Sequence, residues 1–350
     1  MDFKLYDKNY RKLMVFPVVL AVIFLFIIFV FPKVTLGLDF VGGTRLVIDA
    51  GLLDGQSIKN VLSSELGLSD VKVSVVSSPF GTSTRIEYAE PKQLSDARQL
   101  FDQAVLEKNK NPDKAKDLLV QSLSILNKEE SFGDVDSLLQ ETASVLNSET
   151  EKLADRVLSV LVSMFGLSPD ASFTTERVTP SFGSSFLGNA LQVAVVSIIL
   201  LSLVIFISFR EFIPSIAIIE AALFDILTAV ALAALFGFSL TLSSVAALLM
   251  IIGYSVDTDI LLTTRLLKRR DKTVYERANE TLKTGFTVTA SLIGAAGAML
   301  LVSWMAQITT IFEISAIVLF GMLGDLASTW FTNAPVLLWY WEKKHGKVDS

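Results

Sequence analysis

Carboxyl side chains lie within long apolar segments of this 350-residue chain, where an ionised group is costly. At the centre of a bilayer a carboxylate costs roughly 2.5–3.5 kcal/mol on insertion scales, so residues of this kind usually serve a function. No basic residue lies near the middle of the same segments, so desolvation favours the protonated carboxyl. Protonatable acids inside a helix bundle are what a proton relay requires. The acids concerned are Glu220, Asp225, Asp257, Asp259, Glu313 and Asp325.

Four of these acids are our candidates for a proton relay, namely Asp225, Asp257, Asp259 and Asp325. Asp225 lies close to the middle of its apolar segment. Asp257 and Asp259 follow a Gly-Tyr pair at 253–254 that would let a neighbouring helix approach. Asp259 has an alternative role as a local cap that hydrogen-bonds Thr263 or Arg265 one turn onward. Two glycines precede Asp325 and favour helix packing, and the two glutamates lie nearer the ends of their segments.

Several kinds of site are excluded by composition. The chain has no cysteine and a single histidine, His345. Disulfides, thiolate zinc sites, cysteine nucleophiles, histidine metal sites and a Ser-His-Asp triad therefore have no residues to build them. We expect no cofactor, no metal ion, no nucleic-acid partner and no enzymatic activity. With 51% hydrophobic residues and a mean hydropathy of +0.55, the chain is typical of a polytopic membrane protein.

Apolar runs of about 20 residues, the length that a bilayer span needs, predict transmembrane helices. Six such runs are present, at Leu13–Phe31, Leu187–Phe209, Ile213–Phe236, Leu240–Leu262, Thr284–Trp304 and Ile308–Tyr340. Lys and Arg gather at the N-terminus, in the predicted loop after the fourth helix and in the C-terminal tail, and because basic loops are retained inside, both termini are expected in the cytoplasm. The sequence therefore predicts a multi-pass protein of the cytoplasmic membrane. The basic residues of that loop are Arg265, Lys268, Arg269, Arg270, Lys272, Arg277 and Lys283.

The spans divide the sequence into four parts. Residues 1–32 hold the cytoplasmic N-terminus and the first helix, 33–186 an acidic extracytoplasmic domain, 187–341 the other five helices, and 342–350 a cytoplasmic tail.

Hydrophobic periodicity gives the outer domain the order strand, helix, strand, strand, helices, strand, which is the order of a ferredoxin-like α+β domain. Its predicted elements are strand Thr44–Asp49, helix Ser57–Leu66, and strands Val71–Ser77, Ser83–Tyr88 and Ser172–Val178. The helical pattern over about 94–165 is longer than that motif requires. We interpret it as an enlarged helical insertion that caps the sheet, with a peptide-binding helical hairpin of tetratricopeptide type as the alternative.

Two motifs at matching topological places resemble those of the SecF family, a membrane subunit of the Sec protein-export machinery. The segment after the first helix is similar to the family's DFxGGT signature, a glycine turn that leads into the first strand. The fourth helix resembles the family's IGYS motif and is closest to its archaeal form, and the third helix has an aspartate and a threonine where the family has them. The matching residues are Asp39, Phe40, Gly42, Gly43, Thr44, Asp225, Thr228, Gly253, Tyr254, Ser255 and Arg265.

This resemblance implies a fold like half of a resistance-nodulation-division (RND) transporter and a partner, SecD, with the same six-helix plan. It also implies that the chain acts with the Sec protein-conducting channel, an unfolded translocating polypeptide and membrane lipid, and that the proton motive force helps to drive export. Two differences stand out. Asp257-Thr258 replaces the Asn-Asp of bacterial members, and Lys283-Thr284 stands where an arginine is expected. A proton pathway in this chain would therefore use different residues from those of bacterial members.

Two other functions compete with protein export. An intramembrane aspartyl protease is suggested by Phe224-Asp225 and by Gly324-Asp325, although Met322 stands where the first glycine of its GxGD motif belongs. A small-molecule or lipid exporter of the RND superfamily is the other alternative.

Overall fold

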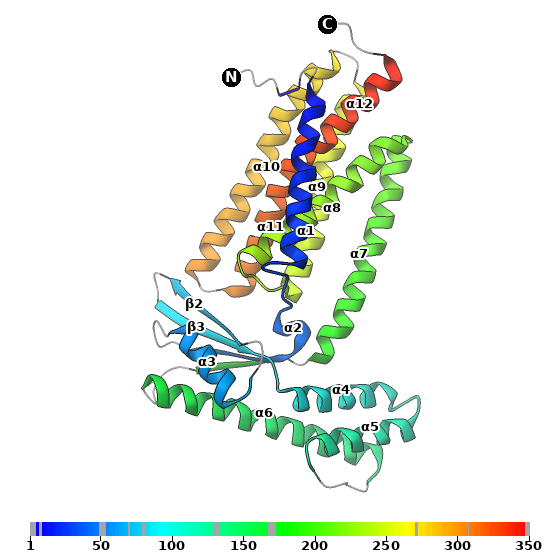
Figure 1. Ribbon diagram of the computed structural model, residues 1–350. Helices are drawn as coiled ribbons and strands as arrows, with labels where there is room; N and C mark the ends of the chain where they lie inside the picture. The colour runs from blue at the N-terminus through cyan, green and yellow to red at the C-terminus, as the bar shows by residue number, and fades with distance from the viewer. Residues whose placement is uncertain are drawn as a thin grey trace. The chain divides into compact units, whose positions relative to one another are not determined.

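The chain divides into two compact units (Figure 1). The membrane unit comprises Met1–Leu36 and Asn189–Ser350, and the α+β unit comprises Gly37–Gly188. The computed structural model describes residues 5–6, 9–48, 54–68, 71–78, 81–128, 133–166, 173–178, 180–269, 272–306 and 308–346.

Six helices are long and apolar enough to cross a bilayer, which confirms the predicted number of spans. The last span consists of three consecutive pieces, α11 (Thr309–Ser328), a π-helical turn η2 (Thr329–Asn333) and α12 (Ala334–His345). A 3-10 turn, η1 (Tyr10–Met14), precedes the first span. The other five spans are built on α1 (Val15–Phe29), α7 (Pro180–Phe209), α8 (Phe212–Leu235), α9 (Leu242–Lys268) and α10 (Val274–Met305).

The middle of the membrane unit is formed by α8, α9 and the last span. In the most apolar window of α8, 56% of the residues are buried, against 11% in α1 and in α7. Figure 1 shows α7 leaning away from the other helices along much of its length. It packs against them near its C-terminal end, where Ile205 and Phe209 contact Ile218, Ala222 and Val256. Side chains that lie between α8, α9 and α11 are therefore shielded from lipid on every side.

The fifth span begins earlier than the sequence analysis predicted. A capping box between Thr273 and Glu276 starts α10 at Val274, and the loop before it is short. The first turns of α10 are amphipathic, with Val274, Ala278 and Leu282 buried, so they extend the helix without adding to the apolar run. The prediction that all seven basic residues lie in a loop is wrong. Four of them belong to helices: Arg265 and Lys268 to the last turn of α9, and Arg277 and Lys283 to the first three turns of α10.

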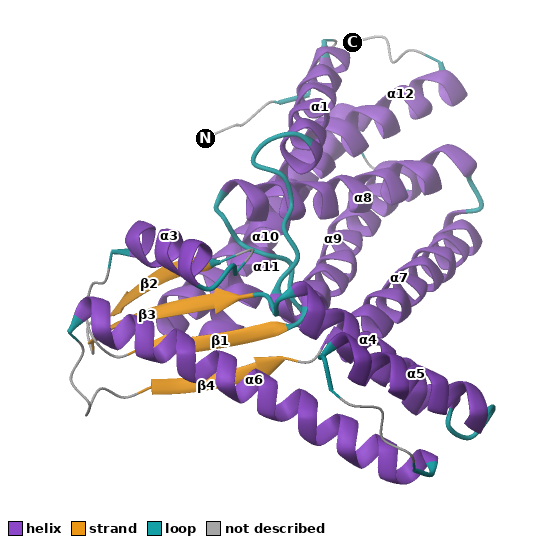
Figure 2. Ribbon diagram, turned by 60° about the horizontal axis from the view of Figure 1, so that its bottom comes forward, coloured by secondary structure: helices purple, strands orange, loops and turns teal. Residues whose placement is uncertain are grey.

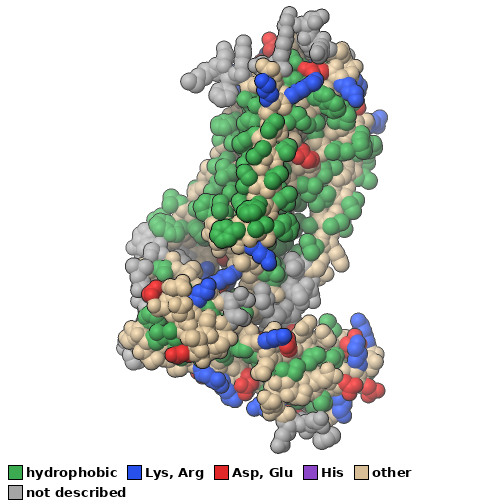
Figure 3. All heavy atoms as spheres, viewed as in Figure 1, with side chains coloured by type: hydrophobic (Ala, Val, Ile, Leu, Met, Phe, Trp, Pro, Cys, Tyr) green, Lys and Arg blue, Asp and Glu red, His purple; other side chains and the backbone are tan. Residues whose placement is uncertain are grey.

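The end of the membrane unit that carries the two termini is polar, and the helix surface beyond it is apolar (Figure 3). At this end Tyr10 Oη donates to Glu342 Oε2 at 2.8 Å, and the Tyr275 hydroxyl donates to the same carboxylate. Lys344 and Tyr340 donate hydrogen bonds to Glu211, between α7 and α8, and these bonds lower the pKa of the Glu211 carboxyl below its ordinary value. Side chains of the N-terminal segment, of α10 and of α12 are thereby tied together.

The α+β unit contains a four-stranded antiparallel sheet in the order β2-β3-β1-β4. This is the order of a ferredoxin-like domain, as predicted. Leu46 and Ile86, on β1 and β3, point to the face that is covered by α3 (Gly55–Glu65) and by Val157 and Leu161 of α6 (Figure 2). A short helix, α2 (Leu38–Val41), leads into β1. The strands are β1 (Gly43–Ile48), β2 (Lys72–Ser78), β3 (Gly81–Tyr88) and β4 (Phe173–Val178).

The helical insertion consists of α4 (Lys92–Glu107), α5 (Pro112–Ile125) and the long α6 (Val135–Phe165). The C-terminal half of α6 covers the sheet. Its N-terminal half packs against the α4–α5 hairpin through an apolar cluster that includes Ala104, Leu119 and Leu138. One helix therefore serves both the sheet and the hairpin, which fixes the hairpin to the ferredoxin-like core.

A buried ion pair anchors α4 to α6. Arg98 Nε donates to Glu90 Oε2 at 3.1 Å, and its second guanidinium nitrogen donates to Thr150 Oγ1 at 2.8 Å. We expect Arg98→Ala to destabilise α6 by about 3–5 kcal/mol, because it leaves the Glu90 carboxylate buried without a partner. Native-state hydrogen exchange of α6 amides in the full chain measures this loss. Arg156→Ala, at an exposed position of α6, is the matched control and should change stability by less than about 0.5 kcal/mol; equal exchange in the two variants would contradict the prediction.

Candidate functional site

Three carboxyl groups meet in the middle of the membrane unit. Asp225 comes from α8, Asp259 from α9 and Asp325 from α11, and their exposed fractions are 0%, 0% and 1%. In the part of the chain that the structure describes, the ion pairs of the membrane unit lie near the helix ends and none involves these three acids. Hydroxyl and amide groups surround them instead.

Asp225 is held by two serines from neighbouring helices. Ser255 of α9 donates to Asp225 Oδ2, and Ser328 of α11 donates to Asp225 Oδ1 at 2.6 Å. The Ser255 hydroxyl also lies close to the carboxyl group of Asp325. Asp225 and Asp325 thus share Ser255 as a polar neighbour.

Asp325 and Asp259 are joined by Thr329 of η2, which contacts both carboxyl groups. Thr329 Oγ1 lies 3.1 Å from Asp325 Oδ1 and 2.9 Å from Asp259 Oδ1. Thr289 of α10 donates to the other oxygen of Asp325 at 3.1 Å, and Asn333 Nδ2 donates to Asp259 Oδ1 at 2.7 Å. The three acids and the two hydroxyls between them are neighbours in one row, which we call the carboxyl network: Asp225, Ser255, Asp325, Thr329 and Asp259.

The hydrogen bonds of the carboxyl network suit a state in which some of its acids are protonated and others are ionised. A hydroxyl group has one hydrogen to donate, so Thr329 satisfies one carboxylate, and its second short contact is favourable when that other carboxyl is protonated and donates to Thr329 Oγ1. Ser255 donates its one hydrogen to Asp225 and lies close to the Asp325 carboxyl. A proton that moves from one acid to the next can do so through these hydroxyls, because each bridging oxygen both donates and accepts.

Close helix packing brings the acids together. A Cβ atom at Gly324 of α11 would lie 3.0 Å from the backbone Cα of Asp225 and 2.8 Å from Thr228 Cβ. A Cβ atom at Gly321 would overlap the side chain of Ile251 on α9. These two glycines let α11 approach α8 and α9 closely, so the packing role that the sequence analysis gave them is confirmed.

The π-helical turn η2 places Thr329 and Asn333 on Asp259. Pro335 has no backbone N–H and cannot continue the hydrogen bonding of the preceding turn, and the chain widens there, with the Ala334 N–H bonding the Thr329 carbonyl. The carbonyl oxygen of Trp330 accepts a hydrogen bond from Tyr6 Oη at 2.9 Å. Wide turns of this kind occur frequently at functional sites.

The structure brings some of the predicted residues together and leaves others outside. Asp225, Asp259 and Asp325 are brought together, and Ser255 of the IGYS motif donates to Asp225 and lies close to Asp325. The side chain of Asp257 is exposed, as are Gly253 and Tyr254, and Gly253 has nothing within 4 Å of an added Cβ. No other described helix of this chain therefore approaches Gly253 closely.

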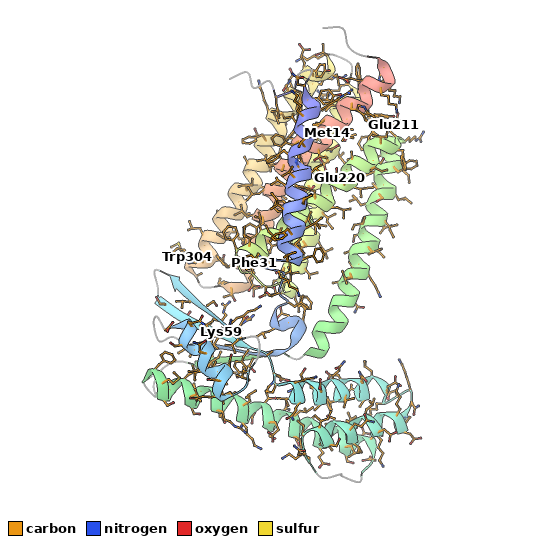
Figure 4. The ribbon with its side chains drawn as sticks, viewed as in Figure 1. Met14, Phe31, Lys59, Glu211, Glu220 and Trp304 are labelled. Carbon is orange, nitrogen blue, oxygen red and sulfur yellow. The ribbon has the colours of Figure 1, made fainter. Side chains whose placement is uncertain are left out.

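Other predicted residues have structural contacts. Thr228 Oγ1 donates to the Phe224 carbonyl at 2.8 Å and packs on Gly324, and Arg265 donates to Thr284 Oγ1 at 2.9 Å. The alternative of Asp259 as a local cap of Thr263 or Arg265 is wrong. Thr263 Oγ1 and Asp259 Oδ2 have no hydrogen-bond partner among the described residues, and Asp259 Oδ1 accepts from Thr329 and Asn333. Of the two glutamates, Glu220 is exposed on α8 (Figure 4), and Glu313 accepts from Thr241 at 3.0 Å.

The residues of the GGT motif shape the entry to the sheet. Gly42 and Gly43 have φ of +77° and +152°, which L side chains rarely adopt. A Cβ atom on Gly43 would overlap the carbonyl oxygen of Tyr88 and lie 2.8 Å from Leu38 Cδ2. Phe40 and Thr44 are buried beside this turn, which also carries Asp39. These motif residues are structural within the α+β unit.

Sequence reasoning missed Ser328, Thr329, Thr289 and Asn333. A usable signal was present for three of them, since 328 and 329 follow Asp325 by three and four positions, on the same helix face, and Asn333 lies one turn further. In the described part of the chain, no group of three or more His, Cys, Asp or Glu side chains could hold a metal ion.

Comparison with known proteins gives two family matches. Residues 163–343 match the family described as "Protein export membrane protein SecD/SecF, C-terminal", and residues 27–50 match the SecD/SecF GG motif. The chain is 41% identical over 179 residues to the protein-export membrane protein SecF of Methanolacinia petrolearia, a match that covers 51% of this chain and 62% of the relative. Its match to SecF of Pyrococcus furiosus is 40% identical over 191 residues and covers 55% of this chain and 62% of the relative. The chain thus spans less than two thirds of the length of these relatives.

Solved structures show the same fold. SecDF of Thermus thermophilus, described as a translocon-associated membrane protein, matches with a TM-score of 0.60 at 16% identity, over 95% of this chain and 38% of that chain. SecDF in a super-membrane-facing form matches with a TM-score of 0.53 at 17% identity, over 96% of this chain and 38% of that chain. With its C-terminal half matched by the family and its GG motif in place, the chain belongs to the SecD/SecF family of protein-export membrane proteins.

Proposed function

We propose that this chain is an accessory subunit of the Sec protein translocase that acts with SecD to promote protein export, driven by the proton motive force. The carboxyl network is the observation that carries this proposal. The network contains three buried acids with hydroxyl groups between them, and none has a basic partner among the described residues. Such acids suit a site that takes up and releases protons better than a site of permanent ion pairs. The family membership and the SecF relatives support the role in export.

The proposal includes an orientation. Basic residues on the last turn of α9 and the first turns of α10 lie at the end of the membrane unit that carries both termini, and such residues are retained in the cytoplasm. We therefore place both termini inside and the α+β unit outside the cytoplasmic membrane. In that position the α+β unit would meet the unfolded polypeptide as it leaves the Sec channel.

The exposed stripe of α9 is the proposed contact with SecD. Asp257 has no hydrogen bond or ion pair with another described residue, and it lies on an otherwise apolar surface beside Gly253 and Tyr254. A carboxylate in this position is costly against lipid, and a partner helix with a polar group would remove that cost. Asp257 would then enter the proton pathway from the subunit interface, whereas the carboxyl network lies inside this chain.

Crosslinking tests this contact, and the absence of cysteine from the chain makes the labelling specific. We expect Gly253→Cys, labelled with a photoreactive maleimide, to crosslink to SecD in membranes that contain both proteins. Leu203→Cys, on the exposed surface of α7 with a 54% exposed side chain, is the control and should not crosslink. Equal crosslinking from the two positions, or none from position 253, would contradict the proposed interface.

The proposal also holds that the chain is not an enzyme. An aspartyl protease needs a water molecule between two carboxyl groups. Here both oxygens of Asp225 accept from serines, and both oxygens of Asp325 are in contact with threonines. This filling of the carboxyl oxygens supports a relay over a hydrolytic site.

The test of the function is export in proteoliposomes that contain the Sec channel, SecD and this chain. Export of a preprotein should increase when a proton gradient is imposed, and an uncoupler should remove the increase. Without this chain, export should stay at the level that is seen in the presence of the uncoupler. Stimulation that is unaffected by the uncoupler would contradict proton coupling.

A further inference from the structure

The polar atoms next to Asp259 are not all satisfied. Asp259 Oδ2, Thr263 Oγ1 and Asn333 Oδ1 are buried and have no hydrogen-bond partner among the described residues. The exposed fraction of each of these three residues is 0%. A buried oxygen without a partner is costly, and three in one region need an explanation such as a bound ion or ordered water.

The three oxygens belong to one place in the fold. Asn333 is fixed on Asp259 by its 2.7 Å hydrogen bond, which leaves the amide oxygen for another partner. Thr263 lies one helical turn beyond Asp259, on the same face of α9. Both are on the side of Asp259 that leads toward the basic end of α9, and Asp325 is joined to Asp259 through Thr329. The unsatisfied oxygens therefore belong to neighbouring residues of α9 and η2 at the Asp259 end of the carboxyl network.

Oxygen atoms alone suit a hard cation, and the charge indicates which kind. One carboxylate and two neutral oxygens balance a single positive charge, whereas a divalent ion would leave an excess charge inside the apolar bundle. No group of three or more acidic, histidine or cysteine side chains in the described residues could hold a metal ion, so this region lacks the several carboxylates that favour a divalent ion. Interrupted transmembrane helices hold Na⁺ or proton sites in transporters, and the regular α-helix of the last span is interrupted at η2.

We propose that Asp259, Thr263 and Asn333 form a binding site for a monovalent cation, Na⁺, which competes with the proton for Asp259. A role of this site in energy coupling rests on the proposed function, whereas sodium binding itself does not. Sodium on Asp259 neutralises the carboxylate as a proton does, so the two ions exclude each other. Because the ligand must be deprotonated, sodium affinity falls as pH falls.

Sodium binding to the purified full-length chain tests the proposal. We expect NaCl to raise the melting temperature and choline chloride at equal ionic strength not to raise it, and we expect saturable binding of radioactive sodium that weakens at lower pH. Thr263→Val, which is nearly isosteric, and Asn333→Ala each remove one ligand. Each should reduce sodium affinity at least about tenfold, which corresponds to about 1.4 kcal/mol of binding free energy. Asp259→Asn should abolish binding.

The matched control is Thr281→Val on α10. Thr281 is buried like Thr263, but its hydroxyl is satisfied by the Arg277 carbonyl at 2.7 Å, so sodium affinity should not change. Equal effects of NaCl and choline chloride on the unmodified chain would overturn the cation site and leave proton-driven export unaffected. Sodium binding together with export that ignores an uncoupler would instead overturn proton coupling and leave the cation site in place.

Discussion

Asp259→Asn is expected to reduce gradient-dependent stimulation of export to the level seen without a proton gradient. The amide keeps the size of the side chain and its contacts with Thr329 and Asn333, but it cannot take up and release a proton. A charge that moves through 100 mV supplies about 2.3 kcal/mol, so removal of the relay removes that driving force entirely. The measurement is export of a preprotein into proteoliposomes with and without the gradient.

Glu220→Gln is the matched control for this experiment. Glu220 is also an acid within a transmembrane helix, but its side chain is exposed and lies outside the carboxyl network. Stimulation should be unchanged in this variant, and both variants should still purify with SecD. Full stimulation in Asp259→Asn would show that export does not depend on the carboxyl network.

Gly43→Ala is expected to destabilise the α+β unit by at least about 3 kcal/mol. Its φ of +152° is unfavourable for alanine, and the added methyl group would overlap the Tyr88 carbonyl on the neighbouring strand, so strain and overpacking add. Hydrogen exchange of β1 and β3 amides in the full chain measures the loss.

Gly67→Ala separates the two causes of this destabilisation. Gly67 has φ of +63° and open space around an added Cβ. Alanine there should therefore cost only the backbone strain of a left-handed conformation, about 1–2 kcal/mol. If Gly43→Ala costs no more than Gly67→Ala, the close approach between β1 and β3 is not what requires glycine in the GGT motif.

The number of spans and the order of the strands could be predicted because each depends on local hydrophobic pattern. The start of α10 could not, since its first turns are amphipathic and Arg277 is buried there while donating to the Leu266 carbonyl at 2.7 Å. A hydropathy scan treats such a turn as a loop. The Thr-x-x-Glu pattern of Thr273 and Glu276, which forms the capping box, is a sequence signal for this start that hydropathy alone does not register.

The acids of the site were identifiable from their cost in an apolar segment, but their directions were not. Asp257 and Asp259 are two positions apart, which is about 200° around a helix, so they cannot both face the same neighbour. Packing decides that Asp259 faces inward and Asp257 outward. Ser328, Thr329 and Asn333 were missed because hydroxyl and amide residues in transmembrane helices usually bond their own backbone, and only a folded bundle brings them onto an acid from another helix.

Infrared spectroscopy of the carboxyl groups tests most directly whether buried acids of this chain hold exchangeable protons. Purified chain in lipid at neutral pH should give an absorption band of protonated carboxylic acid that shifts in D₂O. The band should decrease in a variant that combines Asp225→Asn, Asp259→Asn and Asp325→Asn, and it should persist in Glu220→Gln. If the triple variant has the same band as the unmodified chain, the three acids are ionised at neutral pH and carry no protons through the membrane unit.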